Sequence, residues 1–264
     1  MISGVPAVQA AHPDFSLYEM MRPSRGAGLK HVFGWTAPVI GAPGLLFAAV
    51  TRVQNCNPVD ADDLTAGEVE GRRQITSLVR AANREFFTED AEIRIAALAS
   101  SMGLRESRHA RCLHSLTEAE VLSGQAFDDA AAYGSYRVDI HHDEGITFRY
   151  LDGKQEIMRV DRATGAIAWE RGRWRPEAGE SPTFYQIPYR CLVPRGADNV
   201  LCAGRMLDCD RGAYGACRVM VNCNQMGEAA GVAAARCVAE GAPIETAWRG
   251  LANETLPEID YWQE

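Results

Sequence analysis

A long segment near the C-terminal end of the sequence is built mostly from small residues. Within residues 222–239, five small residues lie at i, i+4, i+7, i+8 and i+11: Cys223, Gly227, Ala230, Gly231 and Ala234. This spacing predicts a helix that carries all five on one face. A glycine inside a helix costs about 1 kcal/mol relative to alanine, so two of them on one face indicate a packing or binding reason.

This bare face has two interpretations, close packing against another element or contact with a flat ligand. The expected start of the helix favours a ligand. Asn222 with Gln225, or Asn224, can cap it, and the free N–H groups and helix dipole attract a phosphate, a carboxylate or a flavin carbonyl. Three arginines add positive charge in the preceding segment: Arg205, Arg211 and Arg218.

The cysteines do not have the spacing of a metal site. Five of the eight lie in residues 199–238, at positions 202, 209, 217, 223 and 237, with no Cys-x-x-Cys pair and no nearby histidine. Structural zinc sites usually take their ligands as tight pairs, so we expect no metal site. Disulfide frameworks are typical of short secreted domains, which leaves reduced, buried thiols as the expectation.

Composition narrows the function classes. The chain of 264 residues is 47% hydrophobic, which is enough for a sizeable core, and its net charge of −8 argues against nucleic acid or anionic membranes as partners. It contains no run of 18 apolar residues, and its first residues lack the basic and apolar regions of a signal peptide. We therefore expect a cytoplasmic protein.

The order of patterns predicts a mixed α and β fold. Residues 44–54 read as a strand, 65–87 as an amphipathic helix and 91–102 as a second, shorter helix. Residues 103–190 read as a mostly antiparallel β module: a strand-like segment around 104–111, a short helix with the capping box Thr117–Glu120, and successive strands. A strand at 199–204, the small-residue helix and a last helix at 244–254 complete the chain.

Four segments, taken together and in order, resemble the C-terminal half of the FAD-dependent oxidoreductase family, of the glutathione-reductase-like flavoprotein class. They span about residues 50–250 and read "DLTAGEVEGRRQ", "RESRHARCLHSLTEAEVLSGQAFDDAAAYGSYRVDIH", "YQIPYRCLVPRGADNVLCAGRMLD" and "RVMVNCNQMGEAAGVAAA". The resemblance implies an FAD cofactor, a small-molecule substrate, a substrate or cap module over residues 1–190, and the C-terminal part of a Rossmann-like FAD-binding domain over 191–264.

The sequence lacks the part of the family's pattern that binds the pyrophosphate end of FAD. Such proteins open with a strand and a G-x-G-x-x-G turn that cradles the FAD pyrophosphate, and this sequence has no such turn. The nearest glycine cluster, "RGAGLKHVFG", lacks the spacing. We therefore expect a truncated or split oxidoreductase that needs a Rossmann half in trans or a homo-oligomer. The alternative is a non-catalytic interaction module that binds a partner or itself through its flavin-facing surface.

The resemblance also implies site residues. On the cofactor side these are Gly204, Arg205, Arg218, Met220 and Gly227. On the substrate side they are Arg108, His141, Tyr189 and Arg190. His141 is the acid/base candidate, because imidazole titrates near neutrality. For Arg108 we favour a buried ion pair with Glu106 over a substrate clamp.

Overall fold

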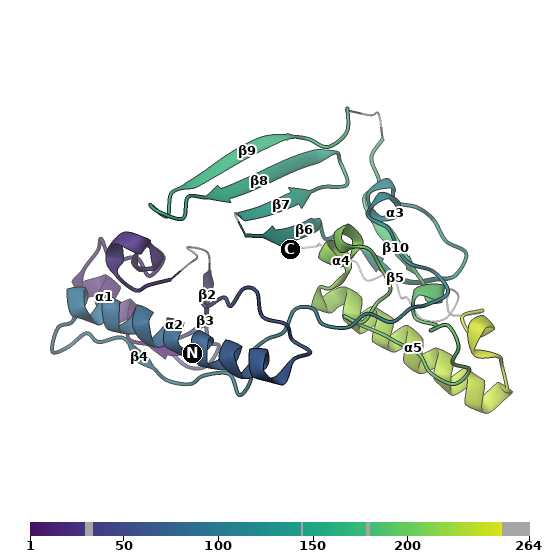
Figure 1. Ribbon diagram of the computed structural model, residues 1–264, viewed down its shortest axis with the longest axis horizontal. Coiled ribbons are helices and arrows are strands. Elements are labelled where there is room, and N and C mark those ends of the chain that lie inside the picture. The colour runs from purple at the N-terminus through teal and green to yellow at the C-terminus, as the bar shows by residue number, and fades with distance from the viewer. Residues whose placement is uncertain (30–33, 144, 178–179, 250–264) are drawn as a thin grey trace. The chain divides into compact units, whose positions relative to one another are not determined.

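The computed structural model describes residues 1–29, 34–143, 145–177 and 180–249. It divides into two compact units, residues 1–104 with 159–168 (unit 1) and residues 105–158 with 169–264 (unit 2). Both contain helices and antiparallel strands, so the predicted mixed α and β class is confirmed (Figure 1). The predicted division at residue 190 is not a boundary of these units and stays a prediction.

Unit 1 is a small sheet covered by one long helix. The sheet has the order β2-β3-β1-β4, and its strands are β1 (Ile2–Ser3), β2 (Trp35–Pro38), β3 (Leu45–Ala49) and β4 (Arg94–Ile95). The helical elements are α1 (Val5–Ala11), η1 (Glu19–Met21), η2 (Pro23–Arg25) and α2 (Ala61–Phe86). The core joins Val8, Met20 and Met21 to Leu78 and Ala82 of α2, all with at most 1% exposure. The strand predicted at residues 44–54 is confirmed as β3.

Helix α2 confirms the predicted helix and begins four residues earlier. Asp60 caps it by accepting hydrogen bonds from the backbone N–H groups of Asp62 and Asp63, both at 3.0 Å. Two side-chain amides on its buried side form hydrogen bonds with the backbone of neighbouring segments of unit 1. The side chain of Gln74 pairs with both backbone groups of Arg52 at 2.8 Å, and that of Asn83 pairs with both backbone groups of Ile93 at 2.8 and 2.9 Å.

The helix predicted at residues 91–102 is wrong. Residues Arg94–Ile95 form β4 instead, with Ile2 opposite Ile95 in an antiparallel pair. The bonds between Asn83 and Ile93 hold the incoming chain extended. Long-range pairing has therefore overridden the helical spacing of the apolar residues.

Unit 2 contains two antiparallel sheets, apart from residues 159–160 of β8 and 167–168 of β9, which belong to unit 1. The first has the order β10-β5, and the second has the order β6-β7-β8-β9. The strands are β5 (Ala130–Gly134), β6 (Val138–His142), β7 (Gly145–Arg149), β8 (Lys154–Val160), β9 (Ile167–Arg173) and β10 (Tyr185–Pro188). The strands predicted between residues 136 and 174 are thus confirmed, and Figure 1 shows them side by side. Residues 104–111 and 199–204, which we expected to be strands, form no named strand.

The helical elements of unit 2 surround its two-stranded sheet. They are α3 (Glu118–Ser123), η3 (Tyr189–Cys191), α4 (Arg211–Cys217), α5 (Met220–Glu240) and η4 (Ile244–Thr246). The capping box is confirmed, since Thr117 and Glu120 each bind the other's backbone N–H at the start of α3. The last predicted helix is reduced to η4, and its residues 250–254 lie outside the described residues.

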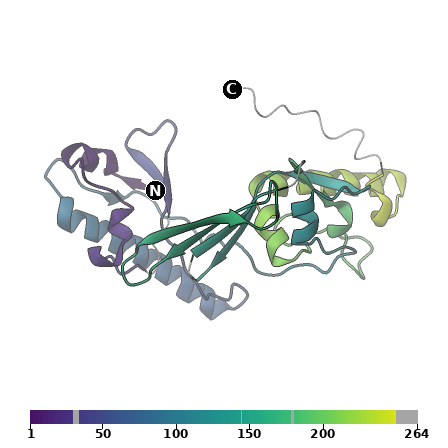
Figure 2. The same cartoon turned by 90° about the horizontal axis from the view of Figure 1, so that it is seen from above.

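The long helix α5 packs against β5 through one side only. Gln225 Oε1 accepts from the backbone N–H of Tyr133, and Gln225 Nε2 donates to its carbonyl, both at 2.9 Å. The buried residues of α5 are Asn222, Met226, Ala229 and Ala233. Figure 2 shows α5 as the long yellow-green helix of unit 2, and α2 as the long blue helix of unit 1. Within the described residues, no helix is long and apolar enough to cross a membrane.

Candidate functional site

The small-residue face of α5 is open. Gly227, Gly231 and Ala234 are exposed, and a Cβ added at either glycine would meet no atom within 4 Å. Cys223 and Ala230 are half-buried at its margin. Nothing in the described part of the chain packs on this face, so close packing within that part does not account for its small residues.

The start of α5 differs from the predicted one. The helix begins at Met220, which is 83% exposed, and its N-cap Val219 contributes no side-chain hydrogen bond. Asn222, expected as a cap, is fully buried and donates to Tyr185 Oη at 2.8 Å. Only Arg218 and Val219 separate α4 from α5, so the helix starts early and carries Asn222 to its buried side.

A cluster of charged side chains lies beside the start of α5, around buried Asp139 of β6. Asp139 Oδ1 lies 3.0 Å from His141 Nε2, and Oδ2 accepts from Arg218 Nη2 at 3.1 Å and from Tyr136 Oη at 3.2 Å. Gly215 of α4 has no side chain, which lets this helix pack close to Asp139, because a Cβ at Gly215 would lie 2.8 Å from the Asp139 carbonyl oxygen. We call Tyr136, Asp139, His141 and Arg218 the Asp139 cluster.

The cluster holds an ionised carboxylate. Burial raises the pKa of Asp139, but the hydrogen bond from His141 and the charges of Arg218 and Arg105 lower it below its usual value. Burial and the Asp139 charge raise the pKa of Tyr136. The cluster therefore presents a neutral phenol and a carboxylate that is shared between an imidazole and a guanidinium.

The predicted cofactor residues Gly204 and Arg205 belong to the turn before α4. Gly204 has a φ of +83° and open space around its Cα. Burial raises the pKa of Cys223, on the first turns of α5, and the positive charge of Arg205 lowers it. The turn thus brings the charge of Arg205 close to the small-residue face. The other three predicted cofactor residues lie between α4 and α5 (Arg218) or on α5 (Met220 and Gly227), and cofactor binding by the five residues stays a prediction.

The RESR segment carried two predictions, a buried ion pair between Glu106 and Arg108 and a place for Arg108 on the substrate side. The buried Glu106–Arg108 ion pair is wrong, because both side chains are exposed and Glu106 Oε1 lies 2.9 Å from His109 Nε2 instead. The segment is held by Tyr214, whose hydroxyl donates to the carbonyl of Arg105. Arg108 is left as an exposed cation that makes no ion pair within the described residues.

Tyr189 and Arg190, predicted on the substrate side, bind other residues of unit 2. Tyr189 is fully buried and its hydroxyl donates to the carbonyl of Ile244 at 2.9 Å. Arg190 grips buried Asp129 with Nε at 2.8 Å and Nη2 at 3.0 Å. Over the described ranges, no hydrogen bond or ion pair joins either residue to the Asp139 cluster. Of the four predicted substrate residues, His141 alone lies in it.

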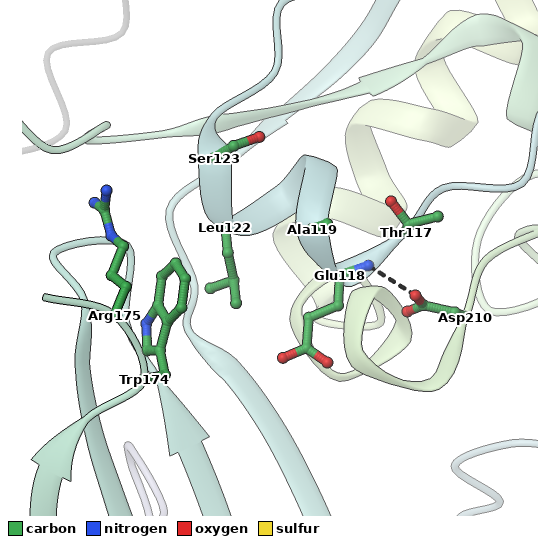
Figure 3. A pocket seen from close by; sticks show the side chains of 8 residues that line it. All are labelled: Thr117, Glu118, Ala119, Leu122, Ser123, Trp174, Arg175 and Asp210. Atoms are coloured by element: carbon green, nitrogen blue, oxygen red, sulfur yellow. Dashed lines mark hydrogen bonds between the residues drawn. The ribbon is translucent and has the colours of Figure 1, made fainter.

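The sequence reasoning missed Asp139 and Tyr136. The alternation Val-Asp-Ile-His places Asp139 and His141 on one face of a strand, which is a usable pattern for Asp139. Tyr136 precedes β6 and has no comparable pattern. Neither is part of the hollow shown in Figure 3, which has a volume of about 600 Å³. That hollow is lined by Thr117, Glu118, Ala119, Leu122, Ser123, Trp174, Arg175 and Asp210.

The cysteines do not form a metal centre within the described residues. All eight are free, and no group of three or more histidine, cysteine or acidic side chains there could hold a metal ion. Burial raises the pKa of Cys112 to about 12 and that of Cys209 to about 12. These thiols are thus protonated packing residues at neutral pH.

Comparison with known proteins gives one match. A family model described as FAD dependent oxidoreductase matches residues 13–250. No curated protein and no solved structure matches the chain.

Proposed function

The chain belongs to the FAD-dependent oxidoreductase family, whose cofactor is FAD, and we propose that unit 2 forms the flavin-facing side of such an enzyme. In this proposal the flavin lies along the small-residue face of α5, and the Asp139 cluster faces the small-molecule substrate beside it. A Rossmann half that grips the pyrophosphate comes from another segment or another chain.

The open face of α5 is the observation that carries this proposal. Gly227 and Gly231 leave room that a Cβ would fill, and no described residue fills it. Met220 is exposed at the first turn, where unpaired backbone N–H groups and the helix dipole favour an electron-rich group. These features fit the flat ring of a flavin. The sequence contains no G-x-G-x-x-G turn for the pyrophosphate, which supports the split arrangement.

Each residue of the cluster has a distinct proposed task. FAD accepts the electron pair of the substrate when it is bound. His141 exchanges the substrate's proton, and its Nε2 lies 3.0 Å from Asp139 Oδ1. Asp139 orients the imidazole, and Arg218 holds Asp139 in place. Arg205 supplies positive charge beside the α5 face. Arg108 stands ready as an exposed cation for the substrate.

Flavin binding by the purified chain tests the proposal. We expect bound flavin to give visible absorbance, or added FAD to quench tryptophan fluorescence in a saturable way. Gly227→Leu fills the open face and should abolish binding, while Ala66→Leu places the same leucine side chain at an exposed position of α2 and should not. Equal binding by Gly227→Leu and the unchanged chain would contradict the proposal for α5.

The split arrangement needs a separate test. If the chain alone binds FAD weakly, a co-expressed Rossmann partner that carries a G-x-G-x-x-G turn should raise the affinity. No increase with such a partner would argue against this part of the proposal. We also propose a cytoplasmic location, because all eight cysteines are free thiols.

The second candidate is a non-catalytic interaction module. Its support is the exposed apolar residues of α5, since Met220, Val221 and Val238 are 83%, 63% and 89% exposed. Such a surface tends to acquire a partner or to self-associate. Sedimentation of the FAD-free chain separates the two candidates. A stable dimer that Met220→Glu dissociates favours the module, and a monomer that binds FAD favours the enzyme.

A further inference from the structure

One face of the four-stranded sheet carries an arginine beside the Asp139 cluster. Alternate residues of an extended segment point to the same side, so Arg137, Asp139 and His141 share a face. The β6–β7 register places Phe148 opposite Asp139. The guanidinium carbon of Arg137 lies 4.0 Å from the centroid of the Phe148 ring, so Arg137 lies on this face too.

Aromatic rings extend this face away from the cluster. Trp169 of β9 stacks on Phe148 with ring centroids 6.3 Å apart and an angle of 17° between the planes. Phe148 is 7% exposed, whereas Trp169 is 46% exposed and offers a free ring surface. The rings of Tyr136 and Tyr150 lie 5.6 and 5.7 Å from the Arg137 guanidinium carbon. The guanidinium thus sits on an aromatic platform.

The charge of Arg137 has no carboxylate partner within the described residues, although the chain as a whole carries a net charge of −8. The two nearby acids are already engaged. Asp139 binds His141 and Arg218, and Glu156 accepts from Tyr150 Oη at 2.7 Å and from Arg171 Nε at 3.0 Å. Arg137 interacts with the hydroxyl of Tyr150 and with the charge of Glu156, but no carboxylate of the described residues forms an ion pair with it, so it can accept an anionic ligand.

We propose that Arg137 binds the carboxylate of a small organic acid whose unsaturated body lies on Trp169. A planar guanidinium presents parallel N–H donors that match a carboxylate, and an exposed indole ring suits a flat carbon skeleton. Arg137 and His141 are four residues apart along the strand, which is about 13.6 Å, so a ligand held at Arg137 reaches His141 only if its body spans that distance. The proposal thus gives small unsaturated carboxylic acids as the substrate class of the proposed oxidoreductase. Binding of the acid at Arg137 does not depend on that function, and only its later oxidation or reduction rests on it.

Benzoate is the probe, and benzamide is its matched neutral analogue. We expect calorimetric titration of the flavin-free chain to show saturable benzoate binding and much weaker benzamide binding. Arg137→Gln should weaken benzoate binding by roughly tenfold or more, since a charge-assisted hydrogen bond is lost. Arg137→Lys keeps the positive charge but lacks the parallel N–H donors of the guanidinium fork. Its benzoate affinity should lie between those of the unchanged chain and Arg137→Gln. Arg94→Gln removes one positive charge from an exposed site in unit 1 and should bind benzoate normally.

The outcomes separate this inference from the proposed function. Benzoate binding that Arg137→Gln removes, in a variant with an unchanged urea midpoint, supports the carboxylate site even if the chain binds no flavin. Flavin binding without benzoate binding overturns the site and leaves the flavin proposal standing. Equal binding of benzoate and benzamide, or loss in Arg94→Gln as well, also overturns it. If Arg137→Gln unfolds, Arg137→Lys decides, and unchanged affinity in that variant would count against the fork.

Discussion

His141 Nε2 lies 3.0 Å from Oδ1 of Asp139, a carboxylate that is 7% exposed. The other oxygen of Asp139 accepts from Arg218, the residue that leads into α5. One buried carboxylate therefore connects the proposed acid/base residue to the helix that we propose lies against the flavin. A substitution at Asp139 should therefore affect both His141 and Arg218.

Asp139→Asn should strongly destabilise the protein. The substitution leaves Arg218, whose side chain is 13% exposed, without its anionic partner. Removing one member of a buried pair typically costs about 3–5 kcal/mol in the free energy of unfolding. Urea denaturation measures this cost. The control is Asp152→Asn, which breaks an exposed ion pair with Lys154 and should cost about 1 kcal/mol or less. Equal losses in the two variants would contradict the buried pairing.

The contribution of Asp139 should disappear in acid. Its folded-state pKa is depressed by His141, Arg218 and Arg105 against the opposing effect of burial. A depressed carboxyl pKa stabilises the fold above the unfolded value of about 3.9, and this stabilisation is lost as the pH falls through the folded value. The difference in unfolding free energy between the unchanged chain and Asp139→Asn should shrink as the pH falls below about 4. A constant difference down to the lowest pH would refute this.

Short-range patterns in the sequence predicted much of the local structure. The α2 helix and the Thr117–Glu120 capping box depend on residues within one or two turns, and strands β6–β9 follow from alternation and turn residues. The small-residue face of α5 was also predicted, because it depends on helix geometry alone.

The features that the sequence did not predict depend on partners that are distant in the sequence. The helix expected at 91–102 does not form, because β4 pairs instead with β1, which lies at the start of the sequence. Arg190 and Asp129 are 61 residues apart, and Arg218 and Asp139 are 79 apart. No local pattern reports such pairs. The sequence identified Arg190 and Arg218 as candidates, and only the fold shows that the first binds Asp129 and the second binds Asp139.

The same substitution should have opposite effects in two neighbouring helices. Gly227→Ala adds a methyl group to open space, so helix propensity should raise the free energy of unfolding by about 0.5–1 kcal/mol. Gly215→Ala places a Cβ 2.8 Å from the Asp139 carbonyl oxygen and should lower it. Chemical denaturation of both variants tests this. A destabilised Gly227→Ala would show that a described residue does pack on the α5 face.

Tyr189→Phe should reveal a structural role. Its hydroxyl donates to the carbonyl of Ile244 inside the core, and removing it leaves that carbonyl unpaired at a cost of about 1–3 kcal/mol. Flavin and benzoate binding should be unchanged at a temperature where the variant is folded. Unchanged stability with lost ligand binding would instead restore Tyr189 to the substrate side.

The thiols should divide sharply by burial in their reaction with a thiol reagent at neutral pH. Cys112, Cys191 and Cys217 are buried, and burial raises the pKa of Cys112 to about 12 and that of the other two as well. The reactive thiolate is then scarce and shielded, so these three should react only after unfolding. Cys56, Cys202 and Cys237 are half-buried and should react in the native protein. Mass spectrometry of peptides after timed labelling gives the order, with a urea-unfolded sample as the control. Early labelling of Cys217 would mean that the core between α4 and β10 opens readily.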